Sequence, residues 1–218
     1  MRMLVYFMYI VTFLLLIPIS VGIRRFSRLE VETKWLLYML VPVAVNQFFS
    51  IWWSNYVMPN NLPFYYLYIL LEVFYLVKIY SLSLKSKPFR LLIWSGVILF
   101  FAFFIFRFAG HWDRIWVYST EIRALEAVIV IILSSCYFHN EYRKEKIINF
   151  LQTPGFWIHG GLILYFSCNL LLFAFSDLVF AQNEDIFQSI WFIHGIVTIL
   201  LYLAFTIAFL CIGKETKF

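Results

Sequence analysis

Charged side chains are scarce in this chain of 218 residues. Asp, Glu, Lys and Arg together make up 13% of it, whereas hydrophobic residues make up 63% and aromatic residues 22%. A soluble domain carries about a quarter charged residues. So few charges exclude a soluble catalytic domain and a nucleic-acid-binding domain, despite the net charge of +5. The composition indicates an integral membrane protein that forms a single domain over residues 1–218.

Cysteine and histidine are also rare, with three and four residues. Each cysteine lies inside an apolar run and no CxxC pair occurs, so neither a disulfide framework nor a zinc site is expected. The histidines fall at different depths of the expected spans, which excludes the three-histidine site of seven-helix zinc hydrolases. They are His111, His139, His159 and His194. No motif of a nucleophilic serine or a phosphate loop is present. We therefore expect no metal, no cofactor and no catalytic motif.

Seven apolar runs follow one another, each near the 20 or so residues that cross a bilayer core of roughly 30 Å. We expect spans at about 3–23, 35–57, 63–84, 88–108, 117–138, 156–180 and 186–212. The first run is not read as a signal peptide, because its basic residues follow the apolar stretch. Pro18 predicts a kink in this span. In the seventh span, Ala204 and Ala208 favour close helix packing. The predicted fold is an all-α bundle of seven transmembrane helices.

Lysine and arginine gather in alternate loops. Twelve lie on one side of the expected membrane and three on the other. The twelve are Arg24, Arg25, Arg28, Lys34, Lys85, Lys87, Arg90, Arg143, Lys144, Lys146, Lys214 and Lys217. Because basic residues mark cytoplasmic loops, we expect the N-terminus outside and the C-terminus in the cytoplasm. We expect a multi-pass protein of the cytoplasmic membrane, with lipids as its immediate partners.

A carboxylate, Glu72, stands in the middle of the third span. An ionisable group at this depth is costly unless it faces the bundle interior and has partners. A helical rise of about 1.5 Å per residue places one polar group from each of five spans at a similar depth in the outer half. We expect them, with Arg123 nearby, to form an outward-facing ligand pocket centred on Glu72. The five are Glu72, Glu126, His194, Asn46 and Asn169.

Other interpretations of these residues stay open. Asn46 and Asn169 are also typical of hydrogen bonds between helices. Arg123 and Glu126 are three residues apart, so they can form a structural ion pair on one helix face. His194 titrates nearest to neutral pH, so it could exchange a proton with Glu72. The cytoplasmic half of the spans is nearly all apolar, which favours a site with a closed floor over a channel.

Three stretches carry a resemblance to a known group of proteins. They are PGFWIHGGLILYFSCNLLLFAFSDLV, YLYILLEVFYL and WFIHGIVTILLYLAF. The chain resembles small seven-span membrane proteins of Bacteroidota, which are similar to the membrane regions that precede some sensor histidine kinases there. The resemblance implies a sensory or signalling module without a catalytic domain of its own, so any kinase is expected on a separate polypeptide.

The function expected is therefore that of a receptor-like or accessory signalling protein that binds a small ligand, lipid or ion from outside. A small-solute or ion transporter is an alternative, and so is an intramembrane lipid-modifying enzyme with a buried carboxylate as general base. A cytoplasmic signalling partner would dock on the loop His139–Gln152, unless the charges of this loop only set the topology and meet anionic lipid. No nucleic acid partner is expected, and no feature indicates an oligomeric state.

Overall fold

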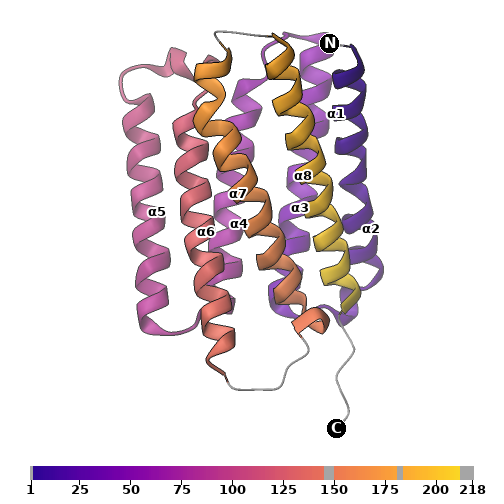
Figure 1. The fold of residues 1–218 in the computed structure, drawn as a ribbon, viewed down its shortest axis with the longest axis vertical. Helices are drawn as coiled ribbons and strands as arrows, with labels where there is room; N and C mark the ends of the chain where they lie inside the picture. Colours follow the sequence, from indigo (N-terminus) through magenta and orange to yellow (C-terminus); the bar gives the residue numbers. More distant parts are fainter. Residues whose placement is uncertain (1, 145–149, 181–183, 212–218) are drawn as a thin grey trace.

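The computed structural model describes residues 2–144, 150–180 and 184–211, with side chains for 3–144, 151–172 and 188–211. The described residues are almost entirely helical and contain no strand. Among them are seven helices that are long and apolar enough to cross a membrane. Figure 1 shows these helices standing side by side as one bundle. The prediction of an all-α bundle of seven spans is confirmed, whereas the direction in which it crosses the membrane remains a prediction.

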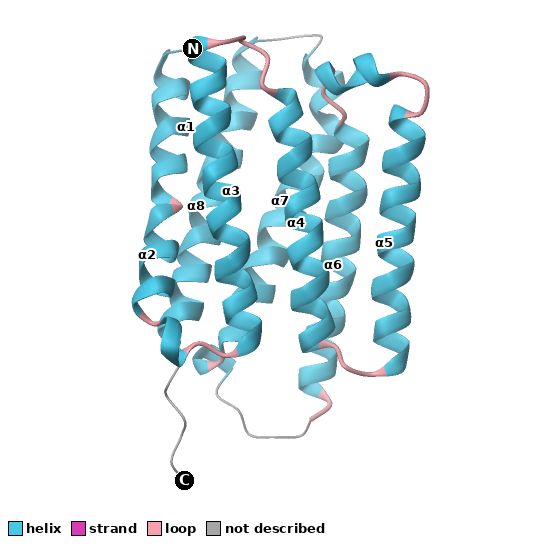
Figure 2. Cartoon of the chain, turned by 180° about the vertical axis from the view of Figure 1, so that it is seen from behind, coloured by secondary structure: helices cyan, strands magenta, loops and turns pink. Residues whose placement is uncertain are grey.

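The helices alternate in direction along the chain and short loops join most of them (Figure 2). The first span consists of α1 and α2, and each later span is one helix. The helices are α1 (Arg2–Leu14), α2 (Leu16–Arg24), α3 (Val31–Tyr56), α4 (Leu62–Ser83), α5 (Lys87–Phe108), α6 (Thr120–Tyr142), α7 (Pro154–Phe180) and α8 (Glu184–Cys211). We call the end where α1 begins the N-terminal end of the bundle, and the end where α8 stops the C-terminal end.

The first span is interrupted at Leu15, between α1 and α2. Pro18 explains the break, because it has no N–H to bond the carbonyl of Leu14 and its ring crowds that carbonyl. The N–H of Leu15 donates instead to the carbonyl of Thr12 at 3.3 Å, which is a tighter turn. The kink that Pro18 predicted is therefore present, one turn ahead of the proline.

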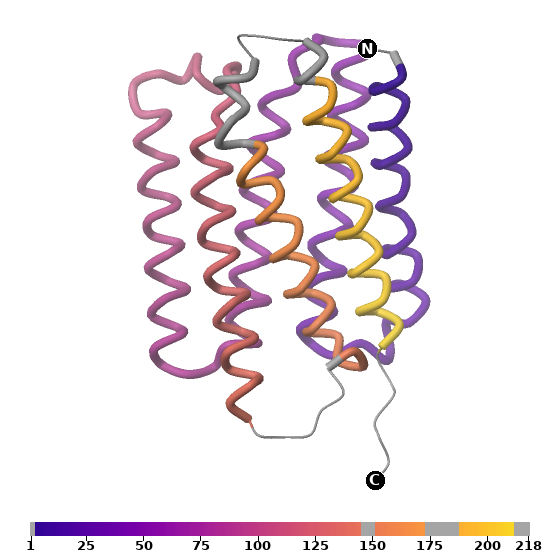
Figure 3. Tube along the Cα trace, in the orientation of Figure 1, coloured from indigo at the N-terminus to yellow at the C-terminus, as the bar shows by residue number. Residues whose placement is uncertain are grey.

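The helices form two layers that face each other. Figures 1 and 3 show α7 and α8 in front of α3 and α4, with α5 at one edge and α1 and α2 at the other. α7 and α8 approach each other closely: a Cβ added at Gly161 would lie 2.8 Å from the Cβ of Ala204, so no larger residue fits there without a shift. Ala208, one turn further on, is completely buried. The close packing that Ala204 predicted occurs against α7.

Two helices extend beyond the apolar runs that predicted them. α3 begins at Val31 rather than at 35, and α6 continues to Tyr142 rather than ending at 138. Each additional turn is polar. An apolar run marks the part of a helix that crosses the membrane, while a polar turn outside the membrane can continue the same hydrogen-bonded helix. The predicted loop 139–155 is thus partly helical, and its residues 145–149 lie outside the described residues.

Candidate functional site

A buried ion-pair cluster joins α4 to α6 in the N-terminal half of the bundle. Nη1 of Arg123 lies 2.5 Å from Oε2 of Glu72 and 2.5 Å from Oε2 of Glu126. The three side chains are at most 4% exposed. Glu126 follows Arg123 by one turn on the same face of α6, while Glu72 reaches it from α4. The ion pair between Arg123 and Glu126 that their spacing predicted is therefore present, with Glu72 as a third member.

The Arg123 guanidinium is held from a third helix as well. Its Nη2 donates to the hydroxyl of Tyr165 on α7 at 3.1 Å. Its central carbon lies 5.2 Å from the ring of Tyr68 and 5.1 Å from the ring of Phe166, within the range of cation–π attraction. A buried arginine must satisfy its donors inside the protein, because no water can replace a missing partner. Contacts from α4, α6 and α7 together therefore fix its position.

A cavity of about 360 Å³ lies on the side of Arg123 that faces α3 and α8. Side chains from α1, α3, α4, α6, α7 and α8 line it, and most of them are polar or aromatic. The polar and aromatic residues of this wall are Thr12, Asn46, Gln47, Ser50, Asn61, Phe64, Tyr65, Tyr68, Tyr118, Arg123, Tyr165, Trp191, His194, Thr198 and Tyr202. We call this space the polar cavity. A volume of this size is at the lower end of the range that small-molecule sites have.

Hydrogen bonds hold two of the wall residues in defined orientations. The amide of Asn169 donates to the carbonyl of Tyr165 at 2.8 Å, so its Oδ1 accepts from Nδ1 of His194, 2.6 Å away. This assigns a proton to Nδ1 of His194. On the opposite wall, Nδ2 of Asn46 donates to the carbonyl of Phe64 at 2.9 Å. Oδ1 of Asn46 has no hydrogen-bond partner among the described residues, although the side chain is buried.

The six candidate residues divide into a wall and a supporting layer. Asn46, Arg123 and His194 line the polar cavity. Asn169 supports His194, while Glu72 and Glu126 support Arg123. The expectation that Glu72 forms the centre of the pocket is corrected here. A carboxylate in a low-dielectric interior is stabilised most by a cation at contact distance, so Glu72 binds Arg123 rather than His194.

The tyrosines of the wall were missed by the sequence analysis. Tyr165 is four residues before Asn169 on α7, and Tyr202 is four residues after Thr198 on α8. Residues four apart share a helix face, so Tyr165 lies on the same face as Asn169, a predicted site residue, and Tyr202 lies on the same face as Thr198. A tyrosine hydroxyl in an apolar span also needs a partner. These two signals together could have indicated an aromatic wall.

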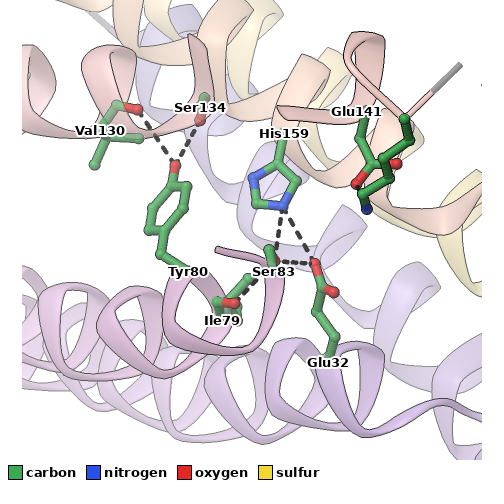
Figure 4. A network of polar contacts seen from close by, with 9 residues as sticks. Glu32, Ile79, Tyr80, Ser83, Val130, Ser134, Glu141 and His159 are labelled. Carbon is green, nitrogen blue, oxygen red and sulfur yellow. Dashed lines mark hydrogen bonds and ion pairs between the residues drawn. The ribbon is translucent and has the colours of Figure 1, made fainter. Parts of the chain in front are cut away.

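A second polar cluster lies at the C-terminal end, between α3, α4 and α7 (Figure 4). Ser83 donates from its hydroxyl to Oε1 of Glu32 at 2.6 Å. Nε2 of His159 lies 3.2 Å from that same oxygen and 3.2 Å from the Ser83 hydroxyl. The His159 ring also stacks on Tyr137, with 3.9 Å between centroids. We call Glu32, Ser83 and His159 the C-terminal cluster.

The C-terminal cluster has the residue types of a hydrolase triad but not its geometry. In such a triad the histidine bonds the serine with one ring nitrogen and the carboxylate with the other. Here both contacts are made by Nε2 of His159, and Nδ1 has no partner among the described residues. If His159 took a proton from Ser83, no carboxylate would bond its other ring nitrogen, Nδ1, to stabilise the resulting imidazolium. This geometry supports a structural role for the cluster.

Within the described residues, no group of three or more His, Cys, Asp or Glu side chains is arranged to hold a metal ion. No protein-family model, no curated protein and no solved structure matches the chain. The fold and the site therefore define the class: a multi-pass membrane protein of seven helices with a polar, aromatic cavity in the N-terminal half of its bundle. The function has to be argued from that cavity.

Proposed function

We propose that this protein is a receptor-like signalling protein that binds a small ligand in the polar cavity and communicates its presence to the opposite face of the membrane. The observation that carries the proposal is the closed floor of the cavity. Toward the C-terminal end, buried apolar side chains such as Leu76, Leu162 and Phe166 fill the bundle interior. A polar chamber above an apolar floor supports binding rather than passage.

The transporter alternative is less well supported by this arrangement. A transport path needs polar groups that can serve a solute on both sides of the midplane. Three polar residues of the C-terminal half, Glu32, Ser83 and His159, are instead engaged with one another in the C-terminal cluster. A binding protein needs no such path. We therefore propose ligand binding, with signalling as its consequence.

The membrane orientation is part of the proposal. Twelve basic residues on one side against three on the other favour a cytoplasmic C-terminal end, with the polar cavity open toward the outside of a bacterial inner membrane. A reporter fused after Phe218 should then be active only in the cytoplasm. The control is the same cytoplasm-active reporter fused ahead of Met1, which should be inactive. Activity of the Phe218 fusion outside the cytoplasm would reverse the topology.

The signal would travel along α7, which contributes one residue to the cavity wall and another to the C-terminal cluster. Its Tyr165 bonds Arg123 beside the polar cavity, and its His159 belongs to the C-terminal cluster. α7 also packs extensively on α6, whose last turn leads into the segment His139–Gln152. A ligand that shifts α7 against α6 would therefore change the geometry of this segment, where we propose that a cytoplasmic signalling protein docks. Lys146 of this segment lies outside the described residues.

Ligand binding is tested with a matched pair of threonines on α8. Thr198 lines the polar cavity and donates to the carbonyl of His194 at 2.8 Å. Thr206, two turns on, makes the same kind of bond to the carbonyl of Tyr202 at 2.7 Å but lies outside the cavity wall. Thr198→Trp fills the cavity, whereas Thr206→Trp adds the same bulk elsewhere. Small molecules retained by the purified full-length proteins are then compared by native mass spectrometry.

We expect the wild type and Thr206→Trp to retain a molecule that Thr198→Trp lacks. Both variants should elute as one species with the helical content of the wild type, which shows that the comparison is between folded proteins. Equal retention by all three proteins, or no retained molecule in any of them, would contradict ligand binding in the cavity.

The docking of a partner is tested by removing the same number of positive charges from two loops. Replacing Arg143, Lys144 and Lys146 by glutamine removes three positive charges from the proposed docking segment. Replacing Lys85, Lys87 and Arg90 removes three from the neighbouring loop at the same end of the bundle. We expect only the first set to reduce recovery of a partner in pull-downs, with expression unchanged in both. Equal loss in both sets would indicate a general charge effect on anionic lipid.

A further inference from the structure

A second cavity continues the polar cavity toward the surface of the bundle. It also measures about 360 Å³ and lies between α1 and α3. Met8, Thr12, Ile51, Asn61 and Trp191 border both spaces, so the two lie next to each other. We call the second space the side opening. It exists because α1 packs chiefly on α8, where Phe7 fits against Gly195, and contacts α3 only sparsely.

The side opening differs from the polar cavity in the chemistry of its wall. On the α1 side it is bordered by Leu4, Val5 and Met8. Val5 is 43% exposed on the outer, apolar surface of α1, the surface that would face lipid. Tyr9 and Ser54 add two hydroxyls, and the Tyr9 hydroxyl accepts from Nδ2 of Asn55 on α3 at 3.2 Å. The path from the bundle surface to Arg123 therefore changes from apolar to polar.

We propose that the ligand of the polar cavity is a membrane lipid with an uncharged, hydroxyl-bearing head group, which enters sideways between α1 and α3. The head lies among the polar and aromatic side chains of the polar cavity, and an acyl chain lies in the side opening. This proposal rests on the proposed function, because it names the chemical class that the cavity binds.

The charge of the wall favours an uncharged head. Among the described residues that border the two spaces, Arg123 is the only Asp, Glu, Lys or Arg. Its guanidinium already contacts two carboxylates, so the cluster has one surplus negative charge when both are ionised and none when one holds a proton. A phosphate head finds no surplus positive charge to bind. A cationic head would meet the guanidinium, which lies between it and the carboxylates.

The polar groups of the wall favour hydroxyls on that head. Oδ1 of Asn46 is a buried acceptor without a partner among the described residues, which a ligand O–H can satisfy. Tyr65, Tyr118 and Trp191 present aromatic surface to the same space. Flat aromatic faces beside amide groups suit a head with hydroxyls on an apolar carbon frame, such as a sugar. We therefore choose a glucosyl lipid as the probe.

The test uses full-length protein in vesicles of dioleoylphosphatidylcholine that contain a trace of a diazirine-labelled lipid. One sample carries monoglucosyl diacylglycerol, and the other carries phosphatidylglycerol with the same labelled chains. After irradiation, adducts are located by peptide mass spectrometry. We expect adducts of the glucosyl lipid to concentrate on the segments of α1 and α3 around Val5 and Ser54. Unlabelled glucosyl lipid should compete for these positions and unlabelled phosphatidylglycerol should not, a result that needs no variant.

A matched pair of serines tests the side opening itself. Ser54 borders it and donates to the carbonyl of Ile51 at 3.0 Å, and Ser95 on the outer surface of α5 donates to the carbonyl of Leu92 at 2.9 Å. Ser54→Trp should reduce the concentrated adducts roughly tenfold, equivalent to about 1.4 kcal/mol of binding free energy. Ser95→Trp should leave them unchanged.

Three results would overturn the inference. The side opening would be excluded as the site of the lipid if adducts spread over the bundle in proportion to exposure. It would also be excluded if Ser54→Trp left the adducts unchanged. Equal labelling by phosphatidylglycerol would remove the requirement for an uncharged head. If the glucosyl lipid fails while Thr198→Trp still loses a retained molecule, the lipid proposal alone is wrong and the cavity binds another ligand. If both experiments fail, the proposed function fails as well.

Discussion

The Arg123 cluster and the C-terminal cluster each join three helices through polar side chains, yet they differ in burial and charge. Arg123 and its two carboxylates are at most 4% exposed and bonded at 2.5 Å. In the C-terminal cluster the Glu32 side chain is 23% exposed, and its contact with His159 is 3.2 Å. Water can reach one carboxylate and not the others. The difference indicates that the stability of the first cluster depends on its internal partners, whereas the second cluster is also stabilised by water.

The same difference explains why the cavity lies beside the Arg123 cluster. Rings and carboxylates hold the guanidinium from α4, α6 and α7, so it can form part of a rigid wall without collapsing into the space. His159 is equally buried, but it stacks on Tyr137 and contacts Ser83 and Glu32 instead of lining the polar cavity. We therefore propose that the first cluster supports a binding surface, whereas the second connects helix ends.

The largest expected effect is the removal of Arg123. Arg123→Met keeps the bulk of the side chain but leaves two buried carboxylates without a cation, so we expect a loss of about 3–5 kcal/mol in the free energy of unfolding. The measurement is unfolding of the full-length protein in mixed micelles with increasing dodecyl sulfate. Adding Glu72→Leu and Glu126→Leu to Arg123→Met should recover most of this loss. If Arg123→Met alone is as stable as the wild type, the two carboxylates do not depend on Arg123 for their charge compensation.

A smaller effect is expected at Glu72, because Glu126 remains to balance Arg123. Glu72→Gln keeps an acceptor for the guanidinium and should change the free energy of unfolding by less than about 1 kcal/mol. Glu72→Leu keeps none and should cost about 1–3 kcal/mol. The same unfolding assay compares the two. If the two variants lose the same amount of stability, the charge of Glu72 matters more than its hydrogen bond.

The C-terminal cluster should tolerate change better. His159→Phe preserves stacking on Tyr137 and leaves Ser83 bonded to Glu32, so we expect a loss of only about 0.5–1.5 kcal/mol. His111→Phe, in an exposed segment, is the control for the change of side chain and should have no measurable effect. A loss at His159 as large as that of Arg123→Met would abolish the distinction between the two clusters.

The smallest effect is expected at the surface of the C-terminal end. Lys144 pairs with Glu141 in a contact whose lysine side chain is 46% exposed. Lys144→Gln should therefore lower the free energy of unfolding by no more than about 0–1 kcal/mol, and added salt should reduce even that difference. Unfolding curves at low and high ionic strength test this. A salt-independent loss would mean that this pair is shielded from water.

Most of the fold could be predicted from the sequence, because the length of an apolar run and the position of Pro18 act locally. The depth argument also selected Asn46 and His194, which line the polar cavity together with Arg123. Depth is only one coordinate, however. It could not show that Glu72 turns toward Arg123, since this depends on how α4 and α6 are rotated and how close they lie. The tyrosines of the cavity wall were not predicted, because tyrosine counts as a hydrophobic residue in an apolar span.

The central claim is that a charge-balanced Arg123 forms one wall of a ligand cavity. The most direct test is a crystal structure of the full-length protein grown from a lipidic mesophase. We predict that the Arg123 guanidinium lies within hydrogen-bond distance of Glu72 and Glu126, and that non-protein density fills the space between Asn46 and His194. A structure in which Arg123 turns away from both carboxylates, or in which α3 and α8 close over that space, would contradict the account.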